Sequence, residues 1–204
     1  MTTGDTVETE RLLLRPLRPD DIDTLSVLFA EPAVWWYPFG RGLTREESQR
    51  FLDRQIGRRE TYGFAMWAAQ LKETNELIGF VGLSVPVWLP EVLPAVEAGW
   101  RLHPSCWGRG LATEGARASL RYGFDTLALD RIIAIYMPDN VASERVMTKL
   151  GMRHWLVTKE PTEGYPLHIR AITADEWRAG VGVEQPVPYA RTPGDEHSGH
   201  GQGL

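Results

Sequence analysis

The sequence predicts an α+β fold, in which a mixed central sheet of about seven strands is flanked by helices. Three observations lead to this class. Apolar runs of strand length and amphipathic segments of helix length follow one another in the order β-α-α-β-β-β-α-β-α-β-β. Asn75–Glu76 supplies turn chemistry between the runs at 64–71 and 77–85, which predicts an antiparallel hairpin. One helical segment separates the strands expected at 96–102 and 131–137, which predicts a right-handed parallel crossover.

Local signals place the remaining elements. A proline inside the first strand indicates a position close to a sheet edge. The pairs Thr44–Glu47 and Thr173–Glu176 are capping boxes, which start helices, and Gly151 ends a helix as its C-cap. The sequence therefore also predicts strands at 11–17, 154–157 and 167–172, helices at about 19–31, 44–62, 109–127 and 140–150, and loops at 34–40 and 86–94.

The bulk composition indicates one globular domain. A chain of 204 residues can bury one core, and 43% hydrophobic with 24% charged residues is ordinary for such a domain. We expect this single domain to span residues 1–180. Residues 181–204 are rich in Gly, Pro, His and polar residues, which predicts a disordered tail.

The net charge and the cysteine content limit which binding partners and which cellular compartment are expected. With 22 basic and 27 acidic residues the net charge is -5, which disfavours bulk nucleic acid as a partner. The excess of acids favours a cationic substrate or serves solubility alone. The single cysteine, Cys106, excludes an intrachain disulfide and fits a reducing compartment. No signal peptide, no apolar run of roughly 18 residues and no zinc-ligand spacing is found, so we expect a cytoplasmic protein without membrane or metal.

Residues 103–118, HPSCWGRGLATEGARA, place two glycines around Arg109 directly before a helix. Backbone amides at such a helix start suit an anion, although a plain strand-to-helix turn has the same pattern. A P-loop is disfavoured because no lysine follows Gly110. A Rossmann fingerprint is disfavoured because Thr113 stands where the third glycine belongs, and because Asp130 precedes the next strand instead of following it.

Four segments carry a common resemblance. Residues 107–112 read WGRGLA, residues 98–104 read AGWRLHP, residues 140–152 read NVASERVMTKLGM, and residues 8–15 read ETERLLLR. The first segment resembles the coenzyme A pyrophosphate loop of the GNAT N-acetyltransferases. In its leading tryptophan, this segment resembles the branch that contains the ribosomal-protein N-terminal acetyltransferases RimJ and RimL. The other three segments resemble that branch too. The resemblance covers about residues 8–178.

The resemblance implies the GNAT (acyl-CoA N-acyltransferase) fold, with splayed fourth and fifth strands, a monomer or homodimer, and acetyl-CoA as cosubstrate without a metal. It implies that the pantetheine arm pairs with the fourth strand and that the diphosphate lies on the glycine turn, where glycines permit close approach. Arg109 either adds a charged contact or is solvated. The expected coenzyme contacts are Trp100, Arg101, Leu102, Trp107, Gly108, Arg109, Gly110, Leu111, Ala112, Thr113, Asn140 and Ser143.

Two residues are candidates for the chemistry of acetyl transfer. An alkyl amine with a pKa of about 10.4 must lose a proton before it attacks. Glu97 stands at the position of an acid common in this branch and is expected to act as general base or to organise a water, unless it is a surface residue of its strand. By resemblance Ser143 lies beside the thioester sulfur as donor or acid, unless it is an ordinary helix-start serine. Asn140 contacts the pantetheine arm or caps the helix. Met147 stands where many relatives carry a tyrosine acid, and Cys106 is expected to be structural.

The acceptor is expected to enter opposite the coenzyme, between walls that include aromatic side chains. Such rings hold an alkyl chain or an ammonium group by cation–π contact, although at least two of them are expected to complete the core. The expected wall residues are Trp35, Trp36, Tyr37, Phe39 and Trp88.

These residues predict direct acetyl transfer from acetyl-CoA to a primary amine, and a protein N-terminus is the preferred candidate for the acceptor. A small-molecule amine, such as an aminoglycoside, a polyamine or an amino acid, is the alternative acceptor. Two other classes stay open: a non-catalytic module that binds acyl-CoA, and a nicotinamide-dependent protein that NAD would stabilise.

Overall fold

The strands form one mixed sheet in the computed structural model, which describes residues 6–180. The sheet has eight strands in the order β1-β2-β3-β4-β5-β6-β8-β7. They are β1 (Val7–Glu8), β2 (Leu12–Pro16), β3 (Met66–Leu71), β4 (Leu77–Ser84), β5 (Val96–Leu102), β6 (Arg131–Tyr136), β7 (Arg153–Lys159) and β8 (Pro166–Thr173). The expected strands are all present, and β1 is an addition that pairs Val7 with Leu14. The tail expected at 181–204 lies outside the described residues.

The helices are α1 (Ile22–Ala30), α2 (Trp36–Phe39), α3 (Arg45–Tyr62), α4 (Leu111–Arg121), α5 (Val141–Lys149) and α6 (Ala174–Arg178). Both expected capping boxes are confirmed, at Thr44 and Thr173. The loop expected at 34–40 contains the single turn α2, in which Tyr37 has extended backbone angles (φ -101°, ψ 125°). The amide of Gly40 closes that turn on the Trp36 carbonyl at 2.7 Å, and Gly40 leaves it with a φ of +64°. Within residues 6–180, no helix has both the length and the apolar character needed to cross a membrane.

Alternating side chains divide the core between the two faces of the sheet. Leu12 and Leu14 of β2 and Val81 of β4 pack in one cluster with residues of α4 and α5. Ala68 of β3 and Phe80 of β4 point the other way and pack with α1 and α3. The helices α3 and α4 therefore cover opposite faces.

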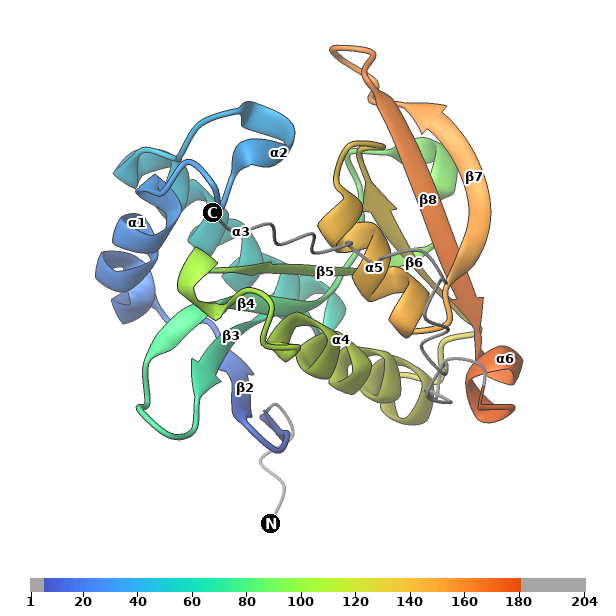
Figure 1. Cartoon of the computed structure of the whole chain (residues 1–204), viewed down its shortest axis with the longest axis horizontal. Coiled ribbons are helices and arrows are strands. Elements are labelled where there is room, and N and C mark those ends of the chain that lie inside the picture. Colours follow the sequence, from blue (N-terminus) through green and yellow to red (C-terminus); the bar gives the residue numbers. More distant parts are fainter. Residues whose placement is uncertain (1–5, 181–204) are drawn as a thin grey trace, which may run out of the picture.

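β5 and β6, the fourth and fifth of the expected strands, separate after a short contact. They run parallel and pair only at Val96–Ile132 and Glu97–Ile133, whereas β5 pairs with β4 from Glu97 to Leu102. In Figure 1, β5 extends toward the half of the molecule that holds α1 to α3, while β6 lies with β7 and β8. The expected parallel crossover and the splayed strands are confirmed, and the two strands form a fork.

Candidate functional site

Glu97 lies where the fork opens, because it is the last residue of β5 that pairs with β6. From Ala98 to Leu102, β5 has β4 on one side, and none of the described strands pairs with it on the other. Backbone groups on a free strand edge can pair with an extended ligand. The fork thus exposes an edge beside Trp100 and Arg101, two of the expected coenzyme contacts.

The glycine turn presents a run of unpartnered amide groups. α4 begins at Leu111, and its first closing hydrogen bond runs from the Glu114 amide to the Gly110 carbonyl at 3.0 Å. Within residues 6–180, no amide from Gly108 to Thr113 donates to a protein acceptor. The start of a helix carries a partial positive charge. This turn is therefore suited to bind an anionic group.

Positive backbone angles shape the turn. Gly108 has a φ of +71° and Gly110 a φ of +79°, values that residues with a side chain rarely adopt. The turn is also anchored on β5, because the indole of Trp107 donates to the Leu102 carbonyl at 2.7 Å. That bond already occupies the Leu102 carbonyl. Of the expected coenzyme contacts, Trp107 therefore also has a positioning role within the protein.

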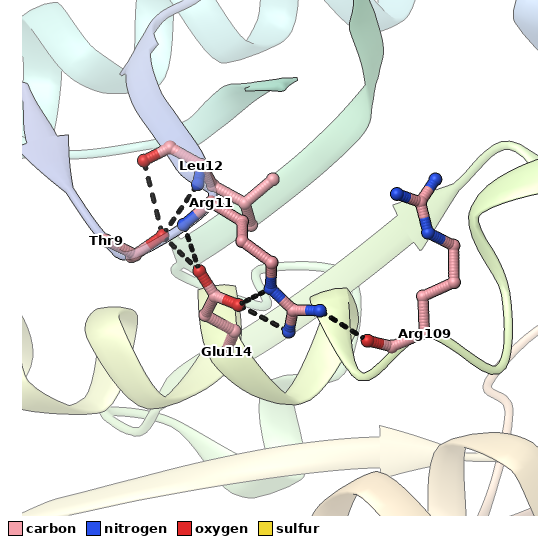
Figure 2. Close-up of polar contacts among 5 residues, drawn as sticks. All are labelled: Thr9, Arg11, Leu12, Arg109 and Glu114. Atoms are coloured by element: carbon pink, nitrogen blue, oxygen red, sulfur yellow. Dashed lines mark hydrogen bonds and ion pairs between the residues drawn. The ribbon is translucent and has the colours of Figure 1, made fainter. Parts of the chain in front are cut away.

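A side chain from the N-terminal segment supports the turn from behind (Figure 2). Arg11 Nη1 donates to the carbonyl of Arg109 at 2.8 Å. In a trans peptide, the carbonyl of one residue and the N–H of the next point in opposite directions. Arg11 thereby directs the amide of Gly110 away from itself. The guanidinium of Arg109 extends away from this cluster.

Glu114, in the first turn of α4, holds Arg11 in place. Its carboxylate accepts from the Arg11 amide at 2.8 Å, from Arg11 Nε at 2.7 Å and from Thr9 Oγ1 at 2.6 Å (Figure 2). Burial acts to raise the pKa of Glu114, but these hydrogen bonds outweigh it and lower the pKa, so the group is ionised. Sequence reasoning missed this cluster. Its only sequence signal was the match of residues 8–15 to a family segment, which says nothing of a contact with α4.

The environment of Glu97 suits a proton acceptor. Burial raises the pKa of Glu97 to about 7, against the opposing charges of Arg58 and Arg101. The side chain keeps partial exposure, which a base facing an opening requires. Its partner across β4 is Ser84, whose Oγ accepts from Arg58 Nη1 at 2.8 Å. A carboxyl with a pKa near the working pH can accept and release a proton.

Arg101 joins β5 to the segment between α1 and α2. Its Nη1 donates to the Val34 carbonyl at 2.8 Å, and its guanidinium carbon lies 4.0 Å from the centroid of the Trp35 ring. Burial lowers the pKa of Arg101 to about 10, although Glu97 opposes the shift. The Arg101 side chain is thus occupied within the protein, and only its backbone is available to a coenzyme.

The aromatic residues expected to form the acceptor wall lie partly in the core and partly on the surface. Trp35 is only 8% exposed and packs edge-on against Phe29 and Phe51, so it is a core residue and its expected place on the wall is corrected. Trp36 and Phe39 are 57% and 53% exposed, and Trp88 is also exposed. These three remain wall candidates. The expectation that at least two of the five rings complete the core is wrong, because among them Trp35 alone is buried.

Tyr37 closes a contact across the mouth of the fork. Its hydroxyl donates to the carbonyl of Asp139 at 2.9 Å. Tyr37 belongs to α2, whereas Asp139 lies in the turn between β6 and α5. This hydrogen bond joins the two halves that β5 and β6 separate.

α5 borders the fork from the side of β6. Asn140 Oδ1 accepts from the Ser143 amide at 3.1 Å, so Asn140 is the N-cap of α5. The Ser143 hydroxyl forms no hydrogen bond with any described residue, and the side chain is partly exposed. Met147 is buried in the core. Ser143 is therefore the free hydroxyl at this helix start.

Cys106 is buried, at 4% exposure, within the core cluster that includes α4. This burial agrees with its expected structural role. No group of three or more His, Cys, Asp or Glu side chains in the described part of the chain has the arrangement of a metal site.

The comparisons with known proteins agree with one another. Residues 11–153 match the model of the acetyltransferase (GNAT) domain family. The Bacillus subtilis (strain 168) protein YkkB is 33% identical over 147 residues, which cover 72% of this chain and 84% of YkkB. The uncharacterised N-acetyltransferase YoaA of the same organism is 30% identical over 154 residues, which cover 72% of this chain and 82% of YoaA.

A crystal structure of a GNAT-family acetyltransferase from Bacillus anthracis superposes with a TM-score of 0.71 at 28% identity, covering 84% of this chain and 99% of that one. Its GNAT fold agrees with the splayed strands described above. The family match includes the glycine turn, the fork and α5, and so the chain belongs to the acetyltransferase (GNAT) domain family and is an N-acetyltransferase.

Proposed function

We propose that this enzyme transfers an acetyl group from acetyl-CoA directly to a primary amine. The preferred candidate for the acceptor is a protein N-terminus, as in RimJ and RimL. The observation that carries the proposal is the run of unpartnered amides from Gly108 to Thr113, which follows the free edge of β5. The amides from Gly110 to Thr113 are unpaired because no described side chain caps the start of α4, and those of Gly108 and Arg109 extend the run beyond the helix start. The family match also removes the nicotinamide-dependent alternative.

These features fit coenzyme A, the cosubstrate carrier of the family. The amides of the turn would hold the diphosphate, and the guanidinium of Arg109 would add charge beside it. The free edge of β5 at Trp100 and Arg101 would pair with the pantetheine arm, and Asn140, at the start of α5, would contact the same arm. When bound, acetyl-CoA supplies the acetyl group as a thioester.

Glu97 acts as the base in this proposal. The α-amine of a protein N-terminus, with a pKa of about 8, and an alkyl amine, with a pKa of about 10.4, are both mostly protonated at neutral pH and must lose a proton before they attack. Glu97, with a pKa raised to about 7 by burial, takes that proton directly or through a water. The nearby charges of Arg58 and Arg101 disfavour an ammonium group at this place and so favour the neutral amine.

Ser143 acts on the opposite side of the fork. Its hydroxyl has no partner among the described residues, so it is free to donate to the departing thiolate. Met147 cannot replace it, because that side chain is buried and has no acidic proton. The exposed rings of Trp36, Phe39 and Trp88 would border the acceptor.

The test is thiol release from acetyl-CoA, with the acetylated product identified by mass across a panel of peptides and small amines. We expect at least one amine to accelerate release in the wild type and to do so far less with Glu97→Gln. Preferred acetylation of aminoglycosides, polyamines or amino acids would select the small-molecule alternative. Coenzyme binding without acceleration by any amine would select the non-catalytic module instead.

A further inference from the structure

One side of α3 carries three arginines spaced by a helical turn. Arg50, Arg54 and Arg58 are four residues apart in sequence, and residues with this spacing lie on one face of a helix. We call these three residues the arginine stripe. At about 1.5 Å per residue, it spans about 12 Å along α3.

The stripe lies on the flank of α3 that is turned toward the fork. The residues Phe51, Leu52 and Gln55 bury the helix against the sheet. The opposite flank, with Ile56 and Glu60, borders a cavity of about 310 Å³ beside the end of β2. That flank faces β2, so the arginines face the other way, toward the ends of β4 and β5.

Arg58 connects the stripe to the base. It donates to Ser84 at 2.8 Å, and its charge lowers the pKa of Glu97 against the effect of burial. Arg54 and Arg50 follow at one and two turns from Arg58. The stripe therefore leads away from the carboxyl at which the amine is expected to lose its proton.

Among residues 6–180, no ion pair neutralises the arginine stripe. No described carboxylate forms an ion pair with Arg50, Arg54 or Arg58, whereas Arg41 and Arg45 nearby pair with Glu47 and Asp23. Burial, and then the charges of Arg58 and Arg50, lower the pKa of Arg54. Like charges one turn apart destabilise a helix.

The chain contains enough acidic residues to neutralise the stripe. It has 27 Asp and Glu residues and a net charge of -5, and this net charge taken alone favours a cationic substrate. The local arrangement indicates the opposite. Arg58 has Glu97 nearby, whereas Arg50 and Arg54 form no ion pair with a described carboxylate, and such free arginines suit a ligand that brings its own negative charge.

We infer that the acceptor carries an anionic group, a carboxylate above all, at about 5–10 Å from its reacting amine, and that the arginine stripe binds this group. This inference rests on the proposed function. The coenzyme's phosphates are not the ligand, because they belong to the turn before α4, and α3 and α4 cover opposite faces of the sheet. The anionic group belongs to an ω-amino acid, whose carboxylate lies several bonds from the nitrogen, or to an acidic residue near the start of a polypeptide.

The test compares acceptors that differ only in charge. The peptides Ser-Glu-Glu-Gly, Ser-Gln-Gln-Gly and Ser-Lys-Lys-Gly represent the polypeptide source, and β-alanine with β-alaninamide represents the small-molecule source. We expect kcat/KM to be about tenfold or more higher for the anionic member of at least one set. The set that shows this preference identifies the source. Equal rates within both sets would overturn the inference.

A variant tests whether the arginine stripe causes the preference for anionic acceptors. Arg54→Glu should abolish or reverse it and leave the KM for acetyl-CoA unchanged. The matched control is Arg121→Glu, an exposed helix arginine at the far end of α4, which changes the net charge equally and should keep the preference. A preference that survives in Arg54→Glu would overturn the inference. Should that variant fail to fold, Arg54→Gln replaces it, with loss of the preference expected.

The experiment distinguishes a failure of this inference from a failure of the proposed function. If amines are acetylated without regard to charge, the proposed function stands and the stripe has no part in it. If no amine in any set accelerates thiol release, the proposed function fails and this inference fails with it.

Discussion

Arg11 and Arg109 are separated by 98 positions in the chain, yet Arg11 Nη1 donates to the Arg109 carbonyl at 2.8 Å. The bond orients the peptide between Arg109 and Gly110, so that its N–H faces away from β2. Glu114 holds the same guanidinium by an ion pair of 2.6 Å. The direction of an amide in the glycine turn thus depends on a residue that is far away in the sequence but in contact with the turn in the fold.

We predict that Arg11→Ala weakens acetyl-CoA binding about tenfold, the equivalent of roughly one net hydrogen bond. The cause is a peptide that is free to rotate, so that the Gly110 amide is no longer directed. Titration calorimetry with acetyl-CoA measures the effect. Arg178→Ala is the control, because it removes an exposed arginine and its ion pair with Asp175 in α6 without contacting the Arg11 cluster. Equal affinities in the wild type and Arg11→Ala would refute this positioning role.

Gly110→Ala should destabilise the turn through its backbone. At a φ of +79° an added Cβ meets only the Arg11 side chain, at 3.5 Å, so conformation and not space is the obstacle. We expect a loss of about 1–2 kcal/mol in the free energy of unfolding and weakened coenzyme binding. Gly57→Ala is the matched control, because Gly57 lies in α3 with open space around it. That substitution should stabilise the protein by about 0.5–1 kcal/mol in a denaturant titration.

The pH dependence of the rate should report Glu97. In the wild type, kcat/KM should rise as pH passes through about 7, because the carboxyl must be ionised to accept a proton. Glu97→Gln should lower kcat about 100-fold or more and lose this step, while the affinity for acetyl-CoA stays unchanged. A wild-type profile without a step near 7, or an unchanged rate in the variant, would remove Glu97 from the chemistry.

Glu97 should also affect stability, with a defined sign. Burial raises its pKa from 4.5 to about 7, so the folded protein keeps a proton that the unfolded chain has released between these values. Its contribution is therefore lost as pH rises through this window. Relative to the wild type, Glu97→Gln should gain on the order of 1 kcal/mol of unfolding free energy between pH 5 and pH 8. Melting curves at both pH values measure this, and a constant difference would contradict it.

Ser143 and Asn140 should respond differently to substitution. The Ser143 hydroxyl has no described partner, so Ser143→Ala should slow transfer about 10- to 100-fold with little change in stability or coenzyme affinity. Asn140→Ala removes the cap of α5 and should lower the free energy of unfolding by about 1 kcal/mol. Single-turnover kinetics and melting curves separate the two effects. A stable Ser143→Ala enzyme with normal turnover would leave this serine without a chemical role.

Local rules made much of the fold readable from the sequence. β5 has the bounds expected for it, both capping boxes form, and Gly151 adopts a φ of +79° at the end of α5. Each of these depends on residues within a few positions of one another. The single turn α2 lies within the loop expected at 34–40, and Tyr37, which precedes its proline, keeps extended backbone angles there.

The order of elements, the glycine turn and the family segments could be read from the sequence, because periodicity, caps and turn residues act over one or two helical turns. The place of Trp35 in the core, the raised pKa of Glu97 and the hydrogen bond of Arg11 to the glycine turn followed from the folded structure alone. Burial, charge and hydrogen bonding between distant segments depend on which surfaces the fold brings together. The placement of the arginine stripe beside Glu97 is of the same kind, since α3 and β5 meet only in the folded chain.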